Sequence, residues 1–262
     1  MRAATRTSWQ VTRSVWYALF LREAIARTTA DRFAWFWMLA EPIALVGVMV
    51  GMRTIIMSGQ HISGVDFVPW LITGLLGFFL FRENMMRSLG AVEANKGLFA
   101  YRQVKPVDPV LVRCYLEGIL KSFIFLLFII AGLLLELGLT PADPLRALFD
   151  WIALWLLGIG AGLTLSALST LVPEVGHVTR ITSMPLMLIS GAMIPLNFIP
   201  HELQQYLLWN PIVHGIENLR VSFFPGYRPL PVDSTYLWLW TLSLITLGLL
   251  LHLRFAQRMK AQ

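Results

Sequence analysis

The sequence has 262 residues, of which 56% are hydrophobic and only 14% are charged. Soluble domains carry about 25% charged residues, so this composition excludes an ordinary soluble fold and predicts an all-α protein that crosses a membrane several times. The net charge of +6 lies mostly in short segments beside apolar runs, which indicates membrane topology rather than nucleic-acid binding. The single cysteine, Cys114, excludes an intrachain disulfide bond.

Residues 1–32 are basic and rich in aromatic side chains, and we predict an amphipathic helix lying in the membrane interface. On a helical projection Arg13 and Tyr17 share one side, whereas Val15 and Leu19 share the opposite, apolar side. A solvated basic arm is the alternative, although such arms seldom carry this much aromatic surface. The arginines of this segment are Arg2, Arg6, Arg13, Arg22, Arg27 and Arg32.

Six apolar segments follow, each close to the roughly 20 residues that a helix needs to cross a bilayer. With the N-terminus in the cytoplasm, most lysines and arginines between these segments fall on the cytoplasmic side. The outer side then receives only Arg146, Arg220 and Arg228, so we expect both termini in the cytoplasm. The predicted spans are residues 33–57, 65–81, 109–137, 151–172, 178–199 and 236–255.

Residues 82–105, between the second and third spans, form a basic loop that the charge distribution assigns to the cytoplasm. Met85, Leu89 and Val92 recur at helical spacing, so we predict a short amphipathic helix here. Our hypothesis is that a cytoplasmic partner pushes on this loop and thereby moves the spans. The residues expected to couple to the partner are Ser88, Glu93, Asn95, Lys96, Leu98 and Phe99.

Residues 200–235 form the largest segment outside the cytoplasm, and we predict two short amphipathic helices separated by Asn210-Pro211. Helices this short cannot span a bilayer, so they are expected to be re-entrant or to lie at the outer surface. The sequence contains no repeat or second domain, which makes residues 1–262 a single transmembrane domain. The face expected to be apolar in the second helix consists of Ile212, Ile216, Leu219 and Phe223.

Motifs for catalysis are missing from the sequence. The glycines at 90–97 lack the spacing and the Ser or Thr of a phosphate-binding loop, the histidines have no metal-ligand spacing, and there is no G-x-S-x-G elbow. We therefore expect no enzyme activity and no bound cofactor or metal in this chain. If transport is driven, another subunit is expected to supply the energy.

Charged residues inside the predicted spans are the best candidates for function, because burying a charge in hydrocarbon is costly. Glu117 and Lys121, four residues apart, either neutralise each other as a helical ion pair or place Lys121 on a polar pathway. Arg53 either snorkels outward or attracts an anionic substrate, and the tryptophans either anchor the helix or stack on sugar rings. The candidate pathway comprises Arg13, Arg27, Arg32, Trp35, Trp37, Arg53, Glu117 and Lys121.

The order of these parts resembles the ABC-2 family of export permeases. The coupling loop SLGAVEANKGLF at 88–99, followed by Val104-Lys105-Pro106, is similar to the loop of that family. So are the motifs Ser190-Gly191, Ile194-Pro195, Phe198-Ile199-Pro200, Trp209-Asn210-Pro211 and Glu217-Asn218-Leu219-Arg220. Within the family, the chain length, the N-terminal region and the sequence YRQVKPVDPVLVR at 101–113 resemble capsular polysaccharide export permeases of the KpsM, BexB and CtrC kind.

The resemblance implies a homodimer in the bacterial inner membrane, with two ATP-binding cassette subunits docked below it that bind ATP and Mg²⁺. It also implies a lipid-linked acidic polysaccharide as the substrate, passing between the two copies, and a periplasmic co-polymerase as a further partner. Contacts with membrane lipids are expected, and nucleic acid is not. O-antigen and teichoic-acid permeases share the architecture and remain alternatives within the family.

Two alternatives lie outside this family. An ion-coupled secondary transporter usually has inverted repeats and more buried carboxylates, whereas this sequence has no repeat and few carboxylates within spans. A membrane-embedded enzyme needs a cluster of carboxylates, or of histidine and arginine, at one membrane face, and the sequence has none.

Overall fold

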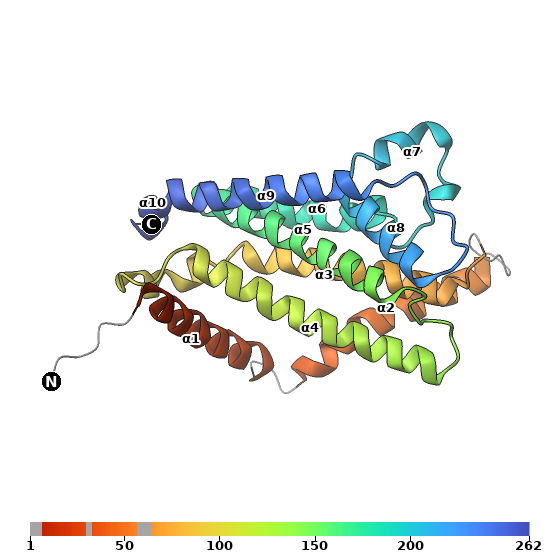
Figure 1. Ribbon diagram of the computed structural model, residues 1–262, viewed down its shortest axis with the longest axis horizontal. Coiled ribbons are helices and arrows are strands. Elements are labelled where there is room, and N and C mark those ends of the chain that lie inside the picture. Colours follow the sequence, from red (N-terminus) through yellow and green to blue (C-terminus); the bar gives the residue numbers. More distant parts are fainter. Residues whose placement is uncertain (1–6, 30–32, 57–63, 262) are drawn as a thin grey trace.

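The computed structural model describes residues 7–29, 33–56 and 64–261, and this part of the chain contains helices and no β-strand. Most of the long helices lie side by side along the longest axis of the molecule (Figure 1). The helices are α1 Ser8–Thr29, α2 Ala34–Ile56, α3 Phe67–Ser88, η1 Glu93–Ala100, α4 Val107–Leu134, α5 Pro144–Leu171, α6 Pro173–Ile189, η2 Leu196–Phe198, α7 His201–Leu207, α8 Pro211–Phe223, α9 Ser234–Arg254 and α10 Ala256–Ala261.

Helix α3 forms the centre of the bundle and packs against α2, α4, α5 and α8. Most of its aromatic and aliphatic residues are buried, and Trp70, Leu75 and Phe78 are inaccessible. The helix extends to Ser88, beyond the predicted end at residue 81, because its polar last turns are buried. The hydroxyl of Ser88 donates a hydrogen bond to the carbonyl of Asn84 at 2.6 Å, so the extension needs no water.

Helices α5 and α9 approach each other closely because glycines lie where they cross. A Cβ atom on Gly248 would lie 2.5 Å from Cβ of Leu163, and a Cβ atom on Gly160 would lie 2.9 Å from Cβ of Leu244. Small residues let helix backbones meet in this way in membranes. The close approach of the two helices allows a hydrogen bond between them, in which the hydroxyl of Thr164 donates to the carbonyl of Leu244 at 2.9 Å.

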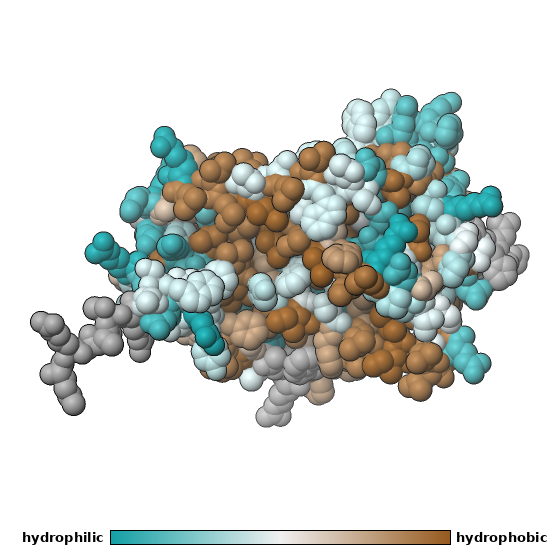
Figure 2. Space-filling view, viewed as in Figure 1, coloured by the Kyte–Doolittle hydropathy of each residue, from teal (hydrophilic) through white to brown (hydrophobic). Residues whose placement is uncertain are grey.

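Three helices of the described chain, α4, α5 and α9, are long and apolar enough to cross a bilayer. Helix α2 contains a shorter apolar segment, Phe36–Met52. Apolar side chains cover the middle of the face in Figure 2, and hydrophilic side chains gather towards both ends. This distribution confirms the predicted all-α membrane protein, in its coarse form.

Helix α6 begins and ends earlier than the predicted fifth span of 178–199. Pro173 occupies the first turn, where its fixed φ and missing N–H favour the start of a helix. The helix stops at Ile189, and Gly191 follows with φ of +71°, a conformation that favours glycine. The expected apolar span is therefore a helix of 17 residues followed by a non-helical segment and η2.

The two short helices predicted in residues 200–235 are confirmed as α7 and α8. The side chain of Asn210 accepts a hydrogen bond from the N–H of Ile212 at 3.0 Å, which caps α8. Helix α7 stands away from the bundle in Figure 1, at the end opposite to α10, whereas α8 inserts into it. The predicted apolar face of α8 is at most 3% exposed and consists of Ile212, Ile216, Leu219 and Phe223.

Helix α1 confirms the predicted amphipathic segment, and its apolar side packs on protein. Val15 and Leu19 are buried in a cluster with Val92 and Phe99 of the coupling loop. The coupling loop itself contains the 3₁₀ helix η1 and not the amphipathic α-helix that we predicted from Met85 onwards. Met85 belongs to α3 instead, because α3 continues through the first residues of the predicted loop.

Candidate functional site

A cavity of about 570 Å³ lies between α1, α2, α3 and α4. This volume falls in the range of about 300–1,000 Å³ that is typical of ligand pockets. Most of its lining side chains are charged, and Ala26, Trp37 and Met38 add apolar surface. The lining residues are Glu23, Ala26, Arg27, Trp37, Met38, Glu41, Arg82, Glu83, Arg87 and Lys121.

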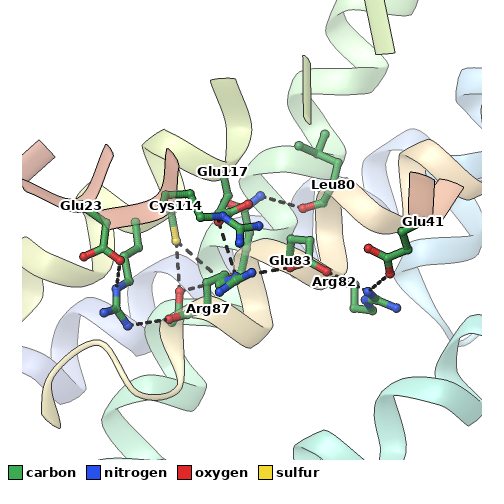
Figure 3. Close-up of polar contacts among 12 residues, drawn as sticks. Glu23, Glu41, Leu80, Arg82, Glu83, Arg87, Cys114 and Glu117 are labelled. Atoms are coloured by element: carbon green, nitrogen blue, oxygen red, sulfur yellow. Dashed lines mark hydrogen bonds and ion pairs between the residues drawn. The ribbon is translucent and has the colours of Figure 1, made fainter. Parts of the chain in front are cut away.

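A continuous row of ion pairs crosses this cavity and joins the four helices (Figure 3). Glu117 of α4 lies at its centre, with Oε1 3.1 Å from Nε of Arg27 in α1 and 3.5 Å from Nε of Arg87 in α3. Arg87 also lies 3.5 Å from Oε2 of Glu83.

The row continues from Glu83 to the next helix. Oε1 of Glu83 lies 2.8 Å from Nη2 of Arg82, which lies 2.8 Å from Oε1 of Glu41 in α2. The exposed fractions of the side chains range from 4% for Glu117 to 47% for Glu41. Charges at the buried end interact strongly, whereas water and salt screen those at the open end.

Carboxylates lie among the cations of this site, and they are more numerous than in the predicted pathway, where Glu117 was the single carboxylate. The lining contains three carboxylates and four basic side chains, and Glu117 is a fourth carboxylate beside it. In the described part of the chain, the ion pairs leave Lys121 without a carboxylate partner, and its ammonium lies 5.6 Å from the ring centroid of Phe79. The carboxylates are Glu23, Glu41, Glu83 and Glu117, and the cations are Arg27, Arg82, Arg87 and Lys121.

Glu117 and Lys121, for which we considered either a helical ion pair or a polar pathway, form no direct ion pair among the described residues. The spacing along α4 permits the pair, but arginines from α1 and α3 reach the carboxylate of Glu117 first. Lys121 is 4% exposed and lines the cavity, and its place on a polar pathway stays a prediction.

The structure brings together only part of the predicted pathway. Arg27, Trp37 and Lys121 line the cavity, and Glu117 lies beside it in an ion pair with Arg27. Arg13 lies in a separate groove between α1 and α4. Arg32 and the side chains of Trp35 and Arg53 lie outside the described residues. Sequence reasoning did not assign Arg82, Glu83 and Arg87 to this site, although these charged residues directly follow the apolar part of α3.

Three of the six predicted coupling residues are buried, namely Ser88, Asn95 and Phe99. Asn95 accepts a hydrogen bond from Arg22 of α1, which ties the coupling loop to the N-terminal helix. Glu93 and Lys96 remain accessible as an ion pair at 3.6 Å, with side chains 76% and 39% exposed, and Leu98 is half-buried. In this conformation only these last three can touch a partner.

A second cluster of charges, which sequence reasoning missed, lies at the opposite end of the bundle. Arg220 of α8 is fully buried, and its Nη1 lies 2.6 Å from Oε1 of Glu217. Its guanidinium also donates to the carbonyls of Trp70 at 3.3 Å, Gly191 at 2.9 Å and Ala192 at 3.1 Å. Arg220 therefore joins α8 to α3 and to the segment after α6.

Aromatic residues complete this cluster. The guanidinium carbon of Arg220 lies 3.5 Å from the ring centroid of Trp70, which is a cation–π contact. The indole of Trp70 donates to the hydroxyl of Tyr227 at 3.0 Å, and that hydroxyl donates to Oε2 of Glu217 at 2.8 Å. The signal in the sequence was an arginine three residues after a glutamate on an otherwise apolar helix, which we assigned to the outer surface.

Comparison with known proteins identifies the family of this chain. A family model described as ABC-2 type transporter matches residues 14–224. The chain belongs to the ABC-2 type transporter family. The resemblance inferred from the coupling loop and from the motifs at 190–220 is thereby confirmed.

Relatives of this ABC-2 chain span almost its whole length. It is 34% identical over 247 residues to the polysialic acid transport protein KpsM of Escherichia coli, which covers 94% of this chain and 95% of that protein. It is 27% identical to the capsule polysaccharide export inner-membrane protein CtrC of Neisseria meningitidis, with coverage of 94% and 92%. The identity and the coverage are the same for BexB of Haemophilus influenzae, which has the same description.

Proposed function

We propose that this chain is the membrane permease subunit of an ATP-driven exporter of a lipid-linked acidic polysaccharide of the capsule type. The observation that carries the proposal is the similarity to KpsM, CtrC and BexB along more than nine-tenths of the chain. Their names describe transport of polysialic acid or export of capsule polysaccharide from the inner membrane. The proposal assigns this chain to the same membrane and to the same class of cargo.

The charged cavity is the proposed entry site for the glycan. A low-dielectric wall focuses the field of its charges, so an acidic polymer is drawn towards basic side chains there. Arg87 is the most exposed cation of the lining and makes the first contact, and Trp37 offers an aromatic face at the rim. Lys121, which is 4% exposed, lies deeper in the cavity. The carboxylates of the polymer then replace Glu83 and Glu117 as partners of the arginines, which loosens the row of ion pairs.

We assign the six spans to α2, α3, α4, α5, α6 and α9, with both termini in the cytoplasm. Three of these helices have the length and hydropathy of a span. Exposed polar residues on α6, among them His177, Arg180 and Thr182, are unsuited to lipid. A homodimer that encloses α6 of both copies solves this problem, and it gives the polymer a path between them.

Energy enters through partner subunits in this proposal. Two ATP-binding cassette subunits, which bind ATP and Mg²⁺, dock at the end of the bundle that carries η1 and α10. Glu93 and Lys96 are the accessible charges of the coupling loop. The buried residues of the loop, including Asn95 and Phe99, transmit the motion to α1 through shared contacts. At the opposite end, α7 faces a periplasmic co-polymerase.

The test is co-expression with a candidate ATPase subunit and purification through a tag on this chain. The expected result is a complex with two copies of each chain and vanadate-sensitive ATP hydrolysis. Recruitment of no ATPase by a folded preparation would refute the proposal and favour an ion-coupled secondary transporter.

A matched pair of variants locates the coupling contact. Glu93→Lys is expected to reduce ATPase recruitment or to uncouple hydrolysis from export, because it reverses an exposed charge of the coupling loop. Glu202→Lys makes the same change on α7, at the opposite end of the bundle, and is expected to leave hydrolysis unchanged. Equal behaviour of the two variants would place the contact elsewhere.

A further inference from the structure

A groove with a volume of about 410 Å³ runs between α1 and the N-terminal part of α4. Trp9, Trp16 and Phe20 line it from α1, and Leu111 and Tyr115 line it from α4. Figure 1 shows how α1 lies along this part of α4. The groove is separate from the charged cavity, because it lies nearer the N-terminus of α1 and has almost no polar lining.

Two polar contacts fix α1 in this position. The indole of Trp16 donates to Oδ1 of Asp108 at 2.9 Å. Nε of Arg113 lies 2.7 Å from Oε1 of Glu23, one turn of α1 beyond the groove. Because both contacts tie α1 to α4, the two helices cannot close the groove without breaking them.

The groove borders an exposed apolar side of α4, which we take to face the bilayer. This helix is long and apolar enough to cross a membrane, and every third or fourth residue forms an apolar stripe that is 45–53% exposed. The stripe starts in the groove itself and continues along the helix. It consists of Tyr115, Ile119, Phe123, Leu126 and Ile130.

A cation stands at the rim of the groove. Arg13 contributes to the lining, its side chain is exposed, and no described residue forms an ion pair with it. Trp9 and Tyr17, at the same rim, are 72% and 68% exposed. Tryptophan and tyrosine favour the level of lipid headgroups, and a cation at that level attracts anionic lipid.

We propose that this groove binds an anionic glycerophospholipid of the surrounding membrane. One acyl chain lies along the stripe of α4 and enters the groove against Phe20 and Leu111, and the phosphate lies at Arg13. A phospholipid fits better than a protein segment, because the groove continues into the bilayer-facing stripe. The lipid fills the space beneath α1 and thereby holds this helix against the bundle.

Electron paramagnetic resonance with spin-labelled lipids tests the site. The full chain is reconstituted in phosphatidylcholine nanodiscs that contain traces of labelled phosphatidylglycerol or labelled phosphatidylcholine. The wild type is expected to immobilise phosphatidylglycerol preferentially. Arg13→Gln is expected to reduce that preference about fivefold, since one basic residue near a membrane surface contributes this much attraction.

Two further variants keep the experiment decisive. Arg254→Gln removes an exposed arginine from the end of α9 and is expected to preserve the preference. Thr12→Phe, which fills the groove while Arg13 stays, is expected to release both labelled lipids from the slow component. Equal immobilisation in the wild type and Arg13→Gln would overturn the proposal. So would displacement of the label by purified lipid-linked glycan but not by unlabelled phosphatidylglycerol, because the occupant would then be the substrate.

Discussion

Two clusters of arginine and glutamate lie at different depths of the same bundle, and they differ in how completely their charges are satisfied. Around Arg220, each guanidinium nitrogen has a protein acceptor and the side chain is fully buried. Around Glu117, the partners Arg27 and Arg87 are 23% and 43% exposed, and one oxygen of Glu117 has no hydrogen-bond partner among the described residues. Arginine and glutamate thus form a buried, fully paired cluster around Arg220, which we call the closed cluster. They form a partly exposed cluster around Glu117, which we call the open cluster.

The comparison shows that burial decides whether a charge keeps one set of partners or can exchange them. A buried charge that loses its partner retains the full cost of desolvation, so the Arg220 cluster has one favourable arrangement. Partly exposed charges can exchange partners with water or with a ligand at little cost. The open cluster between α1 and α4 is therefore suited to rearrangement during transport, and the closed cluster is suited to keeping α8 in place.

The largest effect is expected for Arg220→Met, which leaves the carboxylate of Glu217 buried without its cation. Loss of one partner of such a pair destabilises a protein by about 3–5 kcal/mol. Arg146→Met is the control, since the side chain of Arg146 is 50% exposed and 3.9 Å from Asp150, and surface pairs contribute about 0–1 kcal/mol. Thermal unfolding in detergent measures both, and equal shifts would contradict the contrast between the clusters.

A smaller effect is expected for Gly74→Ala, which tests how tightly the closed cluster is packed. The added Cβ atom would lie 2.0 Å from Nη2 of Arg220 and 2.7 Å from the carbonyl oxygen of Ala192. Overpacking of this kind costs about 1–3 kcal/mol. Gly47→Ala has no atom within 4 Å of the new Cβ and is expected to be neutral or slightly stabilising. A tolerated Gly74→Ala would mean that the Arg220 cluster has room to move.

Tyr227→Phe removes the two hydrogen bonds of the hydroxyl, from Trp70 and to Glu217, and is expected to cost about 2 kcal/mol, at about 1 kcal/mol for each bond. Burial raises the pKa of the Tyr227 hydroxyl above its ordinary value, so the folded protein keeps this proton at alkaline pH. The contribution is complete below a pH of about 10, the ordinary pKa of tyrosine, and is lost as the pH rises above it. Unfolding of both proteins between pH 7 and 11 checks this, and a constant difference throughout would contradict it.

The smallest effect on stability is expected for Lys121→Ala in the open cluster, because in the described chain this lysine forms no direct ion pair and attracts Glu83 and Glu117 only at longer range. Its effect on transport is expected to be large, since the variant removes a cation of the cavity lining that no carboxylate contacts directly. Surface glycan in cells that carry the variant measures export, with Arg254→Ala as the control. Normal export by Lys121→Ala would remove this lysine from the pathway.

Several elements follow from local patterns and were predicted correctly. The apolar residues of α8 recur at helical spacing, Asn210-Pro211 starts this helix, and the N-terminal helix has two unlike sides. Each of these signals involves residues within a few turns of one another, so the chain carries them wherever it folds. The family resemblance has the same basis, because its motifs are short and contiguous.

Other features depend on residues far apart in the sequence. The partners of Glu117 come from α1 and α3, whereas its neighbour in α4, Lys121, stays apart. Helix α3 continues to Ser88 because α4 and α5 surround its polar turns, although hydropathy alone ends the span earlier. The exposure of Glu93 and the burial of Asn95, two residues apart, likewise follow from the position of α1.

The sequence by itself therefore determined the fold class, the helices with clear periodicity and the family, because hydropathy and motifs are properties of contiguous residues. The tertiary structure alone decided which charges are paired, which coupling residues are accessible and that Arg220 lies inside the bundle. The physical reason is that the free energy of a charge in an apolar protein depends on its distance from opposite charges and from water. Only the packing of the helices sets those distances.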